Sequence, residues 1–577
     1  MEHILPEISD RAFRWITYSV ILVALLSICL HIFECAGVTS VWDDSYMTFR
    51  VAHNVLAHGV IAWNGTTPSF GITSTLQVII TVVIAMFSSN PTAVVTISSL
   101  IGTVLFLISI PLLVASVIPA SERIARYLSI AASFTIIALA VHGFSLIAVG
   151  GMDTMLALAF VSLYLIVILR GARSLGTLSR PRLLWIGLLG ASTYLVRPDL
   201  LLFPFLITLS LALWSRAARE RTNAWIILGV TVSALVLLLI GFWVYFGTAL
   251  PLSFIVKGIG HLYGPVTLSR IKFQPVLQFL TYVDTYRVLF IAPIILVLFG
   301  WRRIFVRGEH AIVIGMLASA GAFPLYYLFF VVQMVGYLGR FYYPTLPILL
   351  ALTSLLILLA FRKFFRPDAR SAQLFTAGTA GIMLLVLLYN PLMWGVQQLG
   401  YALVSGDLID KVAWQQNMIA QYREGTNGET RWPCLDVWAA LPNDASVATT
   451  EIGMPSVIAP DKYLQDISGL QSNDITLARM PFDQAIIYRK IDIVYLPYEQ
   501  YYPELRTEIL SSPAFQQQYK FYYRGDPDQL DVAVRNDSPY AATLEKCLAA
   551  VIPPGGAENP PVTQKYYLSL PYPLSGS

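Results

Sequence analysis

Long apolar runs separated by short basic segments dominate the first 396 residues. A helix of about 20 apolar residues crosses the hydrocarbon core of a bilayer. The apolar runs predict eleven membrane-spanning helices, at residues 15–37, 91–117, 126–144, 152–169, 183–196, 200–214, 224–246, 282–300, 311–332, 341–359 and 375–394. A further run at 76–87 is too short to span, so we expect it to lie at the membrane interface or to dip into it.

Clusters of Lys and Arg predict how these helices are oriented. The basic clusters lie at residues 11–14, 121–126, 170–182, 216–221, 301–307 and 361–370. Lys and Arg accumulate in cytoplasmic loops, and two predicted spans separate each successive pair of clusters. The N-terminus is therefore expected in the cytoplasm and the C-terminus outside it. Arg197-Pro198-Asp199 is predicted to form the tight outer turn of a helical hairpin.

The sequence changes character near residue 397 and becomes more polar. Strand-like runs at 445–453, 462–470 and 491–499 are separated by helix-like and Pro-rich stretches. This mixture is typical of a small α/β domain. We expect a transmembrane domain at 1–396, with its first outer loop at 38–90, and an extracytoplasmic α/β domain at 397–577.

Composition supports a multi-pass helical protein of the plasma or inner membrane. Charged residues make up 12% of the chain and apolar residues 56%, whereas soluble domains carry about 25% charged residues. The first apolar run is too long for a signal peptide and no small-residue cleavage site follows it. The net charge of +4 does not indicate a nucleic-acid partner.

The four cysteines are uninformative about function. Cys29 and Cys35 lie in or beside the first predicted span. Cys434 and Cys547 lie in the polar C-terminal region and could pair if it is extracytoplasmic, which the sequence alone leaves open. The sequence has no CxxC motif and no His-rich metal signature.

Charged residues that the predicted topology places on the outer side are the candidate functional groups. Asp43 and Asp44 begin the first polar stretch, and Arg50, His53 and His58 follow them. The later outer segments add Asp153, Arg197, Asp199, Lys257 and Arg340. Outer Lys and Arg run against the positive-inside trend, and charges at membrane depth are usually functional.

This combination of acids and cations suits one type of chemistry. Arg and Lys stabilise a phosphate leaving group, and a carboxylate accepts the proton of an attacking hydroxyl. A sugar on a polyprenyl phosphate requires both groups at the membrane boundary. Transfer of that sugar to a hydroxyl acceptor is the reaction that these residues favour.

Several motifs resemble a known family. The run DDSYMTFRVAHNVLAHGVIAWN at 43–64 resembles the first outer loop of GT-C superfamily glycosyltransferases, above all the bacterial branch that includes the mycobacterial terminal arabinofuranosyltransferase of cell-wall arabinan. Further likeness lies in GITSTLQ (71–77), GGMDTML (150–156), VRPDLLL (196–202), YFGTALPLSFIVK (245–257), GRFYYPTLP (339–347) and LQDISGL (464–470). The chain departs from the family pattern at Thr75, at Asp153 and at Pro251-Leu252-Ser253, where the family has Pro, Glu and Pro-Asn-Thr.

The resemblance implies an inverting transferase that uses a polyprenyl-phosphate sugar and has its catalytic acid in the first outer loop. The donor sugar would be arabinofuranose or another pentose or hexose, and the acceptor a cell-envelope glycan or another lipid-linked or free acceptor. Some GT-C enzymes use a divalent cation at the acidic motif, and this sequence leaves a metal open.

Each candidate residue receives a role in this scheme. Asp44 is preferred over Asp43 as the general base. The donor phosphate is assigned to Lys257, Arg340, Arg197 and Arg50, and other substrate contacts to Tyr46, His53, Asn64 and Asp153.

Structural interpretations compete with these roles. Asp43, Asp44 and Asp153 could cap helices, since carboxylates suit helix N-termini. Lys257 and Arg340 could anchor the chain in lipid headgroups, and Arg197 could simply pair with Asp199. A transporter or flippase of lipid-linked sugars would usually show inverted repeats, and none is visible in the sequence. A membrane anchor presenting a binding domain would not need the outer charges.

Overall fold

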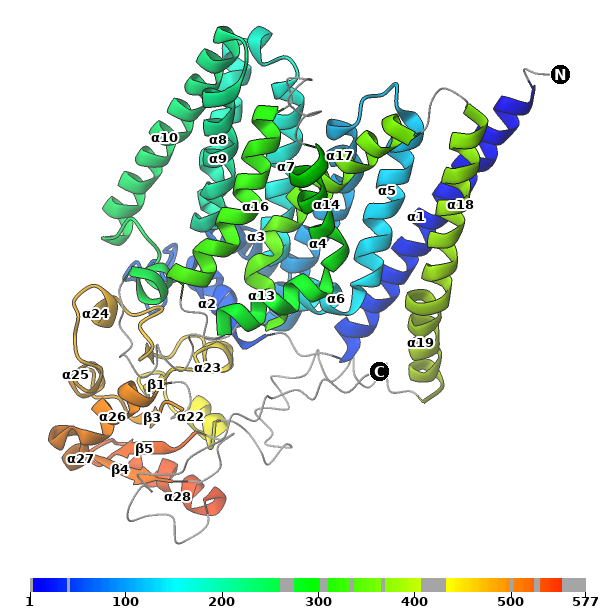
Figure 1. The fold of residues 1–577 in the computed structure, drawn as a ribbon. Helices are drawn as coiled ribbons and strands as arrows, with labels where there is room; N and C mark the ends of the chain where they lie inside the picture. Colours follow the sequence, from blue (N-terminus) through cyan, green and yellow to red (C-terminus); the bar gives the residue numbers. More distant parts are fainter. Residues whose placement is uncertain are drawn as a thin grey trace.

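The computed structural model joins a bundle of long helices to a small α/β domain at one end of the bundle (Figure 1). It describes residues 4–38, 42–259, 274–300, 310–331, 337–364, 369–405, 432–498, 502–523 and 530–552. The predicted basic cluster at 301–307 lies outside the described residues.

Within these residues, six helices are long and apolar enough to cross a membrane. They are α1 (Ile4–Val38), α4 (Pro91–Val117), α7 (Thr154–Ala172), α10 (Ala218–Phe246), α16 (His310–Phe330) and α17 (Leu346–Phe364). The multi-pass helical membrane architecture is therefore confirmed. The number of spans, predicted as eleven, stays a prediction.

Two predicted spans are bent pairs of helices. α5 (Arg123–Leu139) and α6 (Val141–Val149) meet at 78°, and α13 and α14 (Gln274–Thr285, Arg287–Ile295) meet at 87°. If each pair is one span, the described residues hold up to eight spans.

The shorter or less apolar helices are α3 (Thr75–Ala85), α8 (Arg180–Val196), α9 (Leu202–Trp214), α18 (Ala369–Leu387) and α19 (Met393–Ser405). The predicted hairpin turn is confirmed at Arg197, where α8 ends and a short 3-10 turn leads into α9.

Glycines allow the central helices to pack closely. A methyl group on Gly102 of α4 would lie 2.5 Å from the backbone nitrogen of Leu156 in α7. On Gly315 of α16 it would lie 2.7 Å from the Cα of Ile207 in α9. Helices in membranes associate through such close backbone contacts, because lipid offers no hydrophobic driving force between them.

The described basic segments gather at the end of the bundle away from the sheet (Figure 1). Arg362 pairs with Glu122 at 2.8 Å, and Arg173 donates a hydrogen bond to the carbonyl oxygen of Val117. These contacts join segments that the sequence assigns to one side of the membrane.

The C-terminal domain is built on a five-stranded sheet of order β2-β1-β3-β5-β4. The strands are β1 (Val447–Thr449), β2 (Leu464–Asp466), β3 (Ile493–Tyr495), β4 (Tyr519–Tyr522) and β5 (Val532–Arg535). β1 pairs in parallel with β2 and β3, and β5 is antiparallel to both β3 and β4. The flanking helices are α22 (Leu435–Ala440), α23 (Gly453–Ile458), α24 (Asn473–Thr476), α25 (Phe482–Tyr488), α26 (Pro503–Ser511), α27 (Pro513–Gln518) and α28 (Ala541–Val551). The predicted α/β character is confirmed, because the three strand-like runs contain β1, β2 and β3.

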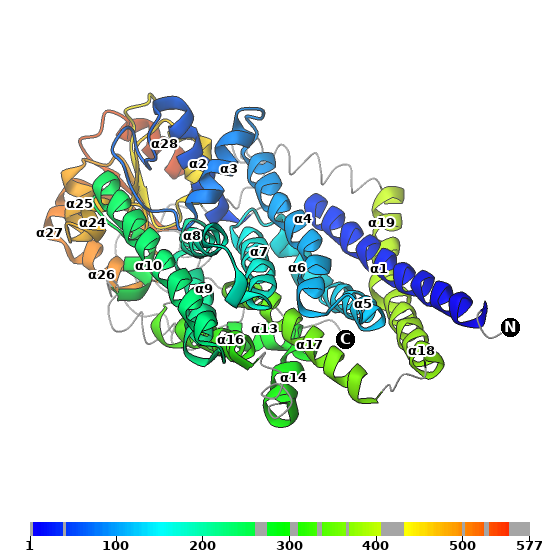
Figure 2. The ribbon, with the colours of Figure 1, turned by 90° about the horizontal axis from the view of Figure 1, so that it is seen from above.

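This domain lies beneath one side of the bundle. Viewed from above, it sits at the end occupied by α2 (Asp43–His58), α8 and α10, and away from α1 and α18 (Figure 2). The parallel strands β1 and β2 are followed by α23 and by a turn at 466–471, and both segments contact the first outer loop. The carboxyl ends of these strands therefore face the membrane helices.

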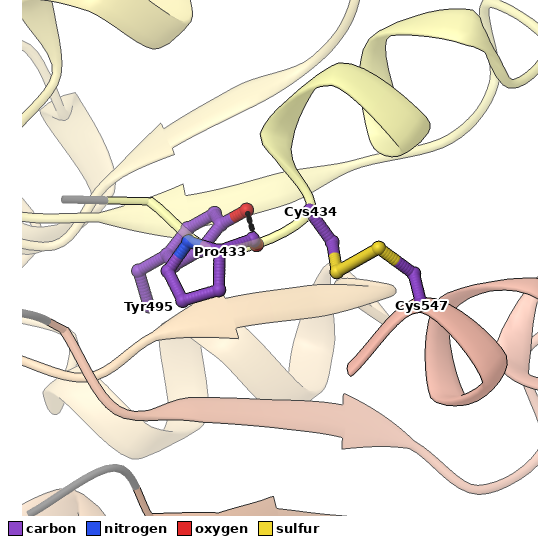
Figure 3. The surroundings of a disulfide bond; sticks show 4 residues. All are labelled: Pro433, Cys434, Tyr495 and Cys547. Atoms are coloured by element: carbon purple, nitrogen blue, oxygen red, sulfur yellow. Dashed lines mark hydrogen bonds between the residues drawn. A yellow bond between two sulfur atoms is a disulfide. The ribbon is translucent and has the colours of Figure 1, made fainter. Parts of the chain in front are cut away.

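A disulfide closes the C-terminal domain. Cys434, at the start of α22, is bonded to Cys547 in α28 across 113 residues of sequence (Figure 3). Next to it, the hydroxyl of Tyr495 donates a hydrogen bond to the carbonyl oxygen of Pro433 at 2.7 Å. The pairing that the sequence left open is present in the structure.

Candidate active site

The segment predicted as the first outer loop, residues 38–90, contributes a short amphipathic helix, α2. Two acids in its first turn suit the positive end of the helix dipole, and Gly59, with φ of 72°, ends the helix. Asp44, Met47 and Thr48 are spaced three and four residues apart, so they share one face. That face lines a cavity at the junction of the bundle and the C-terminal domain.

The cavity collects segments from most of the chain. Its lining residues fall within 44–48, 71–77, 152–154, 197–199, 253–258, 326–331, 340–341 and 470–471. Among the charged residues that the sequence marked as candidates, it brings together Asp44, Asp153, Arg197, Asp199, Lys257 and Arg340. The shared location expected for these charges is thus present in the structure.

An ion pair between Asp44 and Arg340 lies at the centre of the arrangement. Nη2 of Arg340 is 3.0 Å from Oδ2 of Asp44. The arginine side chain is 4% exposed and the aspartate side chain 37%, so the carboxylate remains accessible. The guanidinium lies over the rings of Trp42 and Phe341, at 5.3 and 5.0 Å from their centroids.

Arg340 has unused hydrogen-bonding capacity. Its Nε and Nη1 are buried and find no hydrogen-bond partner among the described residues. Buried polar groups are nearly always paired, and planar guanidinium groups bind phosphate and carboxylate well. Leu338 and Gly339, both with positive φ, turn the chain immediately before Arg340. The site therefore holds two donors suited to an anionic ligand.

Lys257 adds a second cation from a different segment. It lies in the short π-helical turn Ile255–Ile259, where burial lowers the pKa of its ammonium group and nearby Asp44 opposes that shift. Arg340 is close enough to lower this pKa further. Two cations that disfavour each other in a buried site are both stabilised by a bound anion.

A second charge cluster forms the wall of the cavity. Arg197 binds both carboxylate oxygens of Asp199, at 3.1 and 2.8 Å, and its Nη1 lies 3.8 Å from Asp153. Asp199 also accepts a hydrogen bond from the hydroxyl of Tyr327. Burial raises the pKa of Asp153, and Arg197 counteracts this. Arg197 is thus engaged mainly by its neighbours, as the structural interpretation of Arg-Pro-Asp expects.

Asp43 and Asp44 point to different partners. The Asp43 carboxylate accepts hydrogen bonds from the backbone amides of Gly453 and Met454, at 3.0 and 2.7 Å. These amides belong to the first turn of α23, so Asp43 fastens the C-terminal domain to α2. Adjacent side chains on a helix do not face each other, and here one acid faces the cavity while the other binds α23.

Arg50 and Asn64 lie outside the cavity lining, between the first outer loop and the C-terminal domain. Arg50 is 1% exposed and donates to the carbonyl oxygens of Trp63 and Lys462, at 2.9 and 2.6 Å. It also donates to Oδ1 of Asn64, whose Nδ2 donates to the carbonyl oxygen of Leu464. These contacts connect the first outer loop to the C-terminal domain.

Tyr46 and His53 also lie outside the cavity lining. The buried hydroxyl of Tyr46 is 2.9 Å from Oγ1 of Thr92 in α4. Nε2 of His53 is 2.9 Å from a carboxylate oxygen of Asp461 on the surface. In this structure both residues make contacts that position α2.

The lining residues that the sequence did not single out include Thr73, Tyr327 and Gln471. Thr73 and Gln471 fall in or next to quoted motifs, so their location could have suggested them. Tyr327 lies in the last turn of the apolar helix α16, and the sequence gave no signal for it. Among the described residues, no group of three His, Cys, Asp or Glu side chains is arranged to hold a metal ion.

No family model and no curated protein matches this sequence. Three solved structures align with most of the chain. ArnT from Cupriavidus metallidurans bound to undecaprenyl phosphate shows 12% identity over 90% of this chain and 98% of its own, with a TM-score of 0.47. The same protein in the apo state gives 12% identity, 89% and 97% coverage and a TM-score of 0.47.

The third structure is the Archaeoglobus fulgidus oligosaccharyltransferase in complex with zinc and sulfate. It shows 15% identity over 90% of this chain and 73% of its own, with a TM-score of 0.42. Likeness at this level leaves the chemistry of the site to be argued from its own residues.

Proposed function

We propose that this protein is an inverting membrane glycosyltransferase that takes a sugar from a polyprenyl phosphate on the extracytoplasmic side. The observation that carries the proposal is the cavity in which Asp44 pairs with Arg340 while two further N–H groups of that arginine stay without a partner among the described residues. Lys257 supplies a second cation in the same cavity.

The proposed reaction uses these groups in fixed roles. The donor phosphate binds Arg340 and Lys257, which stabilise the negative charge that grows as the sugar departs. The acceptor hydroxyl attacks the anomeric carbon on the face opposite the phosphate, and Asp44 accepts its proton as the bond to the phosphate oxygen breaks. The products are a glycoside of inverted configuration and the free polyprenyl phosphate.

The finer assignments rest on the motif resemblance in the sequence. It favours arabinofuranose as the donor sugar and a cell-envelope glycan as the acceptor. Asp153 and Arg197, which form the wall of the cavity, would shape the space for the sugar. The proposed division assigns the catalytic acids and cations to residues 1–396, and the α/β domain at 397–577 completes the cavity lining with Leu470 and Gln471.

The proposed function is tested with membranes containing the overproduced protein. Short-chain polyprenyl phosphates carrying arabinofuranose, mannose or glucose serve as donors, and octyl oligosaccharides serve as acceptors. We expect transfer from one of these donors, with inversion visible in the NMR coupling of the new anomeric proton. Retention of configuration, or transport of the donor across the membrane without transfer, would contradict the proposal.

The disulfide gives a direct test of orientation. Disulfides persist in oxidising compartments, so the bond between Cys434 and Cys547 supports an extracytoplasmic C-terminal domain. In right-side-out vesicles, a membrane-impermeant maleimide should label both cysteines after reduction and neither before it. A Cys434→Ser/Cys547→Ser variant gives the background signal.

A matched cysteine placed by Arg219→Cys, in the basic segment at 216–221, should react only after the vesicles are opened. Labelling of Cys434 and Cys547 only in opened vesicles would reverse the proposed orientation.

A further inference from the structure

The cavity has a neutral polar group contributed by the C-terminal domain. The side chain of Gln471 lines the cavity, and the residue is 4% exposed. Its Oε1 is buried and has no hydrogen-bond partner among the described residues, and its Nε2 makes only a 3.8 Å contact with the sulfur of Met47. An unpaired buried acceptor costs free energy, so this oxygen is suited to a donor that arrives with a ligand.

The backbone holds Gln471 firmly in this position. Its amide nitrogen donates to Oδ2 of the buried Asp466 at 2.6 Å, and the other oxygen of that carboxylate accepts from the amide of Ser468. Gly469, with φ of 81°, completes the turn. The buried carboxylate therefore fixes the backbone from which the Gln471 side chain extends, so this part of the site needs no ordering on binding.

A glycine in the first outer loop makes room for the amide. A methyl group on Gly71 would lie 1.8 Å from Oε1 of Gln471. The amide therefore rests directly on the backbone of Gly71, and any larger residue there must displace it. A substitution at Gly71 is therefore a second, independent way to displace Oε1 of Gln471.

Gln471 lies beside the helix face that carries the proposed base, Asp44, and it is therefore assigned to the acceptor rather than to the donor phosphate. Met47, which it contacts, is three residues after Asp44 on the same face of α2. The group that meets Asp44 in the proposed reaction is the acceptor hydroxyl. A polyol acceptor has further hydroxyl groups close to the one that reacts.

We infer that Gln471 is a specificity-determining residue of the acceptor subsite, where its Oε1 accepts a hydrogen bond from a non-reacting hydroxyl of a sugar acceptor. The inference rests on the proposed glycosyltransferase function and extends it, because it gives the C-terminal domain a direct part in choosing the acceptor.

The test measures donor and acceptor kinetics separately for Gln471→Met, which keeps the length of the side chain and removes the amide. An octyl oligosaccharide serves as the acceptor probe. In Gln471→Met the KM for this acceptor should rise about tenfold, which corresponds to the loss of one hydrogen bond, while the KM for the donor stays the same. Gln517→Met, an exposed position in the same domain, is the matched control and should leave both constants unchanged.

Gly71→Ala should reproduce the rise in acceptor KM, because the new methyl group displaces the amide. In the Gln471→Met background, Gly71→Ala should raise the acceptor KM by a smaller factor than it does in the native protein, because both substitutions act through Oε1 of Gln471. Thermal unfolding of each variant in detergent identifies any general loss of folding.

The possible failures are distinguishable. If the native protein transfers no sugar from any donor in the panel, the proposed function itself fails. If it transfers sugar and Gln471→Met keeps the acceptor KM, or raises the donor KM instead, only the acceptor-subsite inference is overturned.

Discussion

Exchange of Asp44 for asparagine is expected to slow sugar transfer by roughly 10²–10⁴-fold, the usual contribution of a positioned general base. The amide keeps the size of the side chain but cannot accept the proton of the acceptor hydroxyl. Asp44 also neutralises part of the charge on Arg340, so its loss leaves that cation more available to phosphate. The donor KM should therefore stay the same or fall while kcat collapses.

The neighbouring acid provides a sharp contrast. Asp43→Asn weakens the hydrogen bonds to the amides of Gly453 and Met454, so it should mainly loosen the contact between α2 and the C-terminal domain. Asp537→Asn, an exposed acid that pairs with Arg535 inside that domain, is the control for the chemical change alone. If Asp44→Asn keeps a near-native kcat, Asp44 is not the general base. If kcat falls further in Asp43→Asn than in Asp44→Asn, Asp43 is the base and Asp44 has the structural role.

Local patterns predicted much of the fold. Apolar length identified the long helices, and the Arg-Pro-Asp interruption located the turn between α8 and α9. The 87° bend between α13 and α14 falls at the polar stretch from Asp284 to Arg287, which the span predicted at 282–300 ran across. Strands β4 and β5 also escaped prediction. In β4 only the first residue is buried, so this strand carries no apolar run of the kind that marks a buried strand.

Charge and predicted topology together selected a useful set of site residues but could not assign their partners. Asp44, Lys257 and Arg340 share the cavity, as expected from their common side of the membrane. Arg50 was grouped with them because it follows the same acids, yet its guanidinium donates to Lys462, more than 400 residues later. Whether a cation faces a ligand or clamps a distant segment depends on tertiary contacts that no local pattern encodes.

The cations of the proposed phosphate site are expected to affect both binding and turnover. A phosphate is negative in the ground state and gains charge as the sugar leaves, so each cation acts at both stages. A charge-assisted hydrogen bond contributes about 1.5–3 kcal/mol, and Arg340→Ala or Lys257→Ala should each lose about 10–100-fold in kcat/KM for the donor. Lys257→Ala is the cleaner variant, since the Nζ of Lys257 makes no ion pair or hydrogen bond within the part of the chain that the structure describes.

Replacement of Arg340 by lysine distinguishes a phosphate ligand from a general need for positive charge. Lysine can still pair with Asp44, but a compact ammonium group cannot reproduce the two donors that Arg340 leaves for the phosphate. Donor kinetics at saturating acceptor, in nanodiscs, should therefore show only partial recovery relative to Arg340→Ala. Lys520→Ala, an exposed lysine of the C-terminal domain, controls for the loss of one positive charge. Full recovery in Arg340→Lys would reduce this arginine to the counter-ion of Asp44, and unchanged donor kinetics in both alanine variants would mean that the phosphate binds elsewhere.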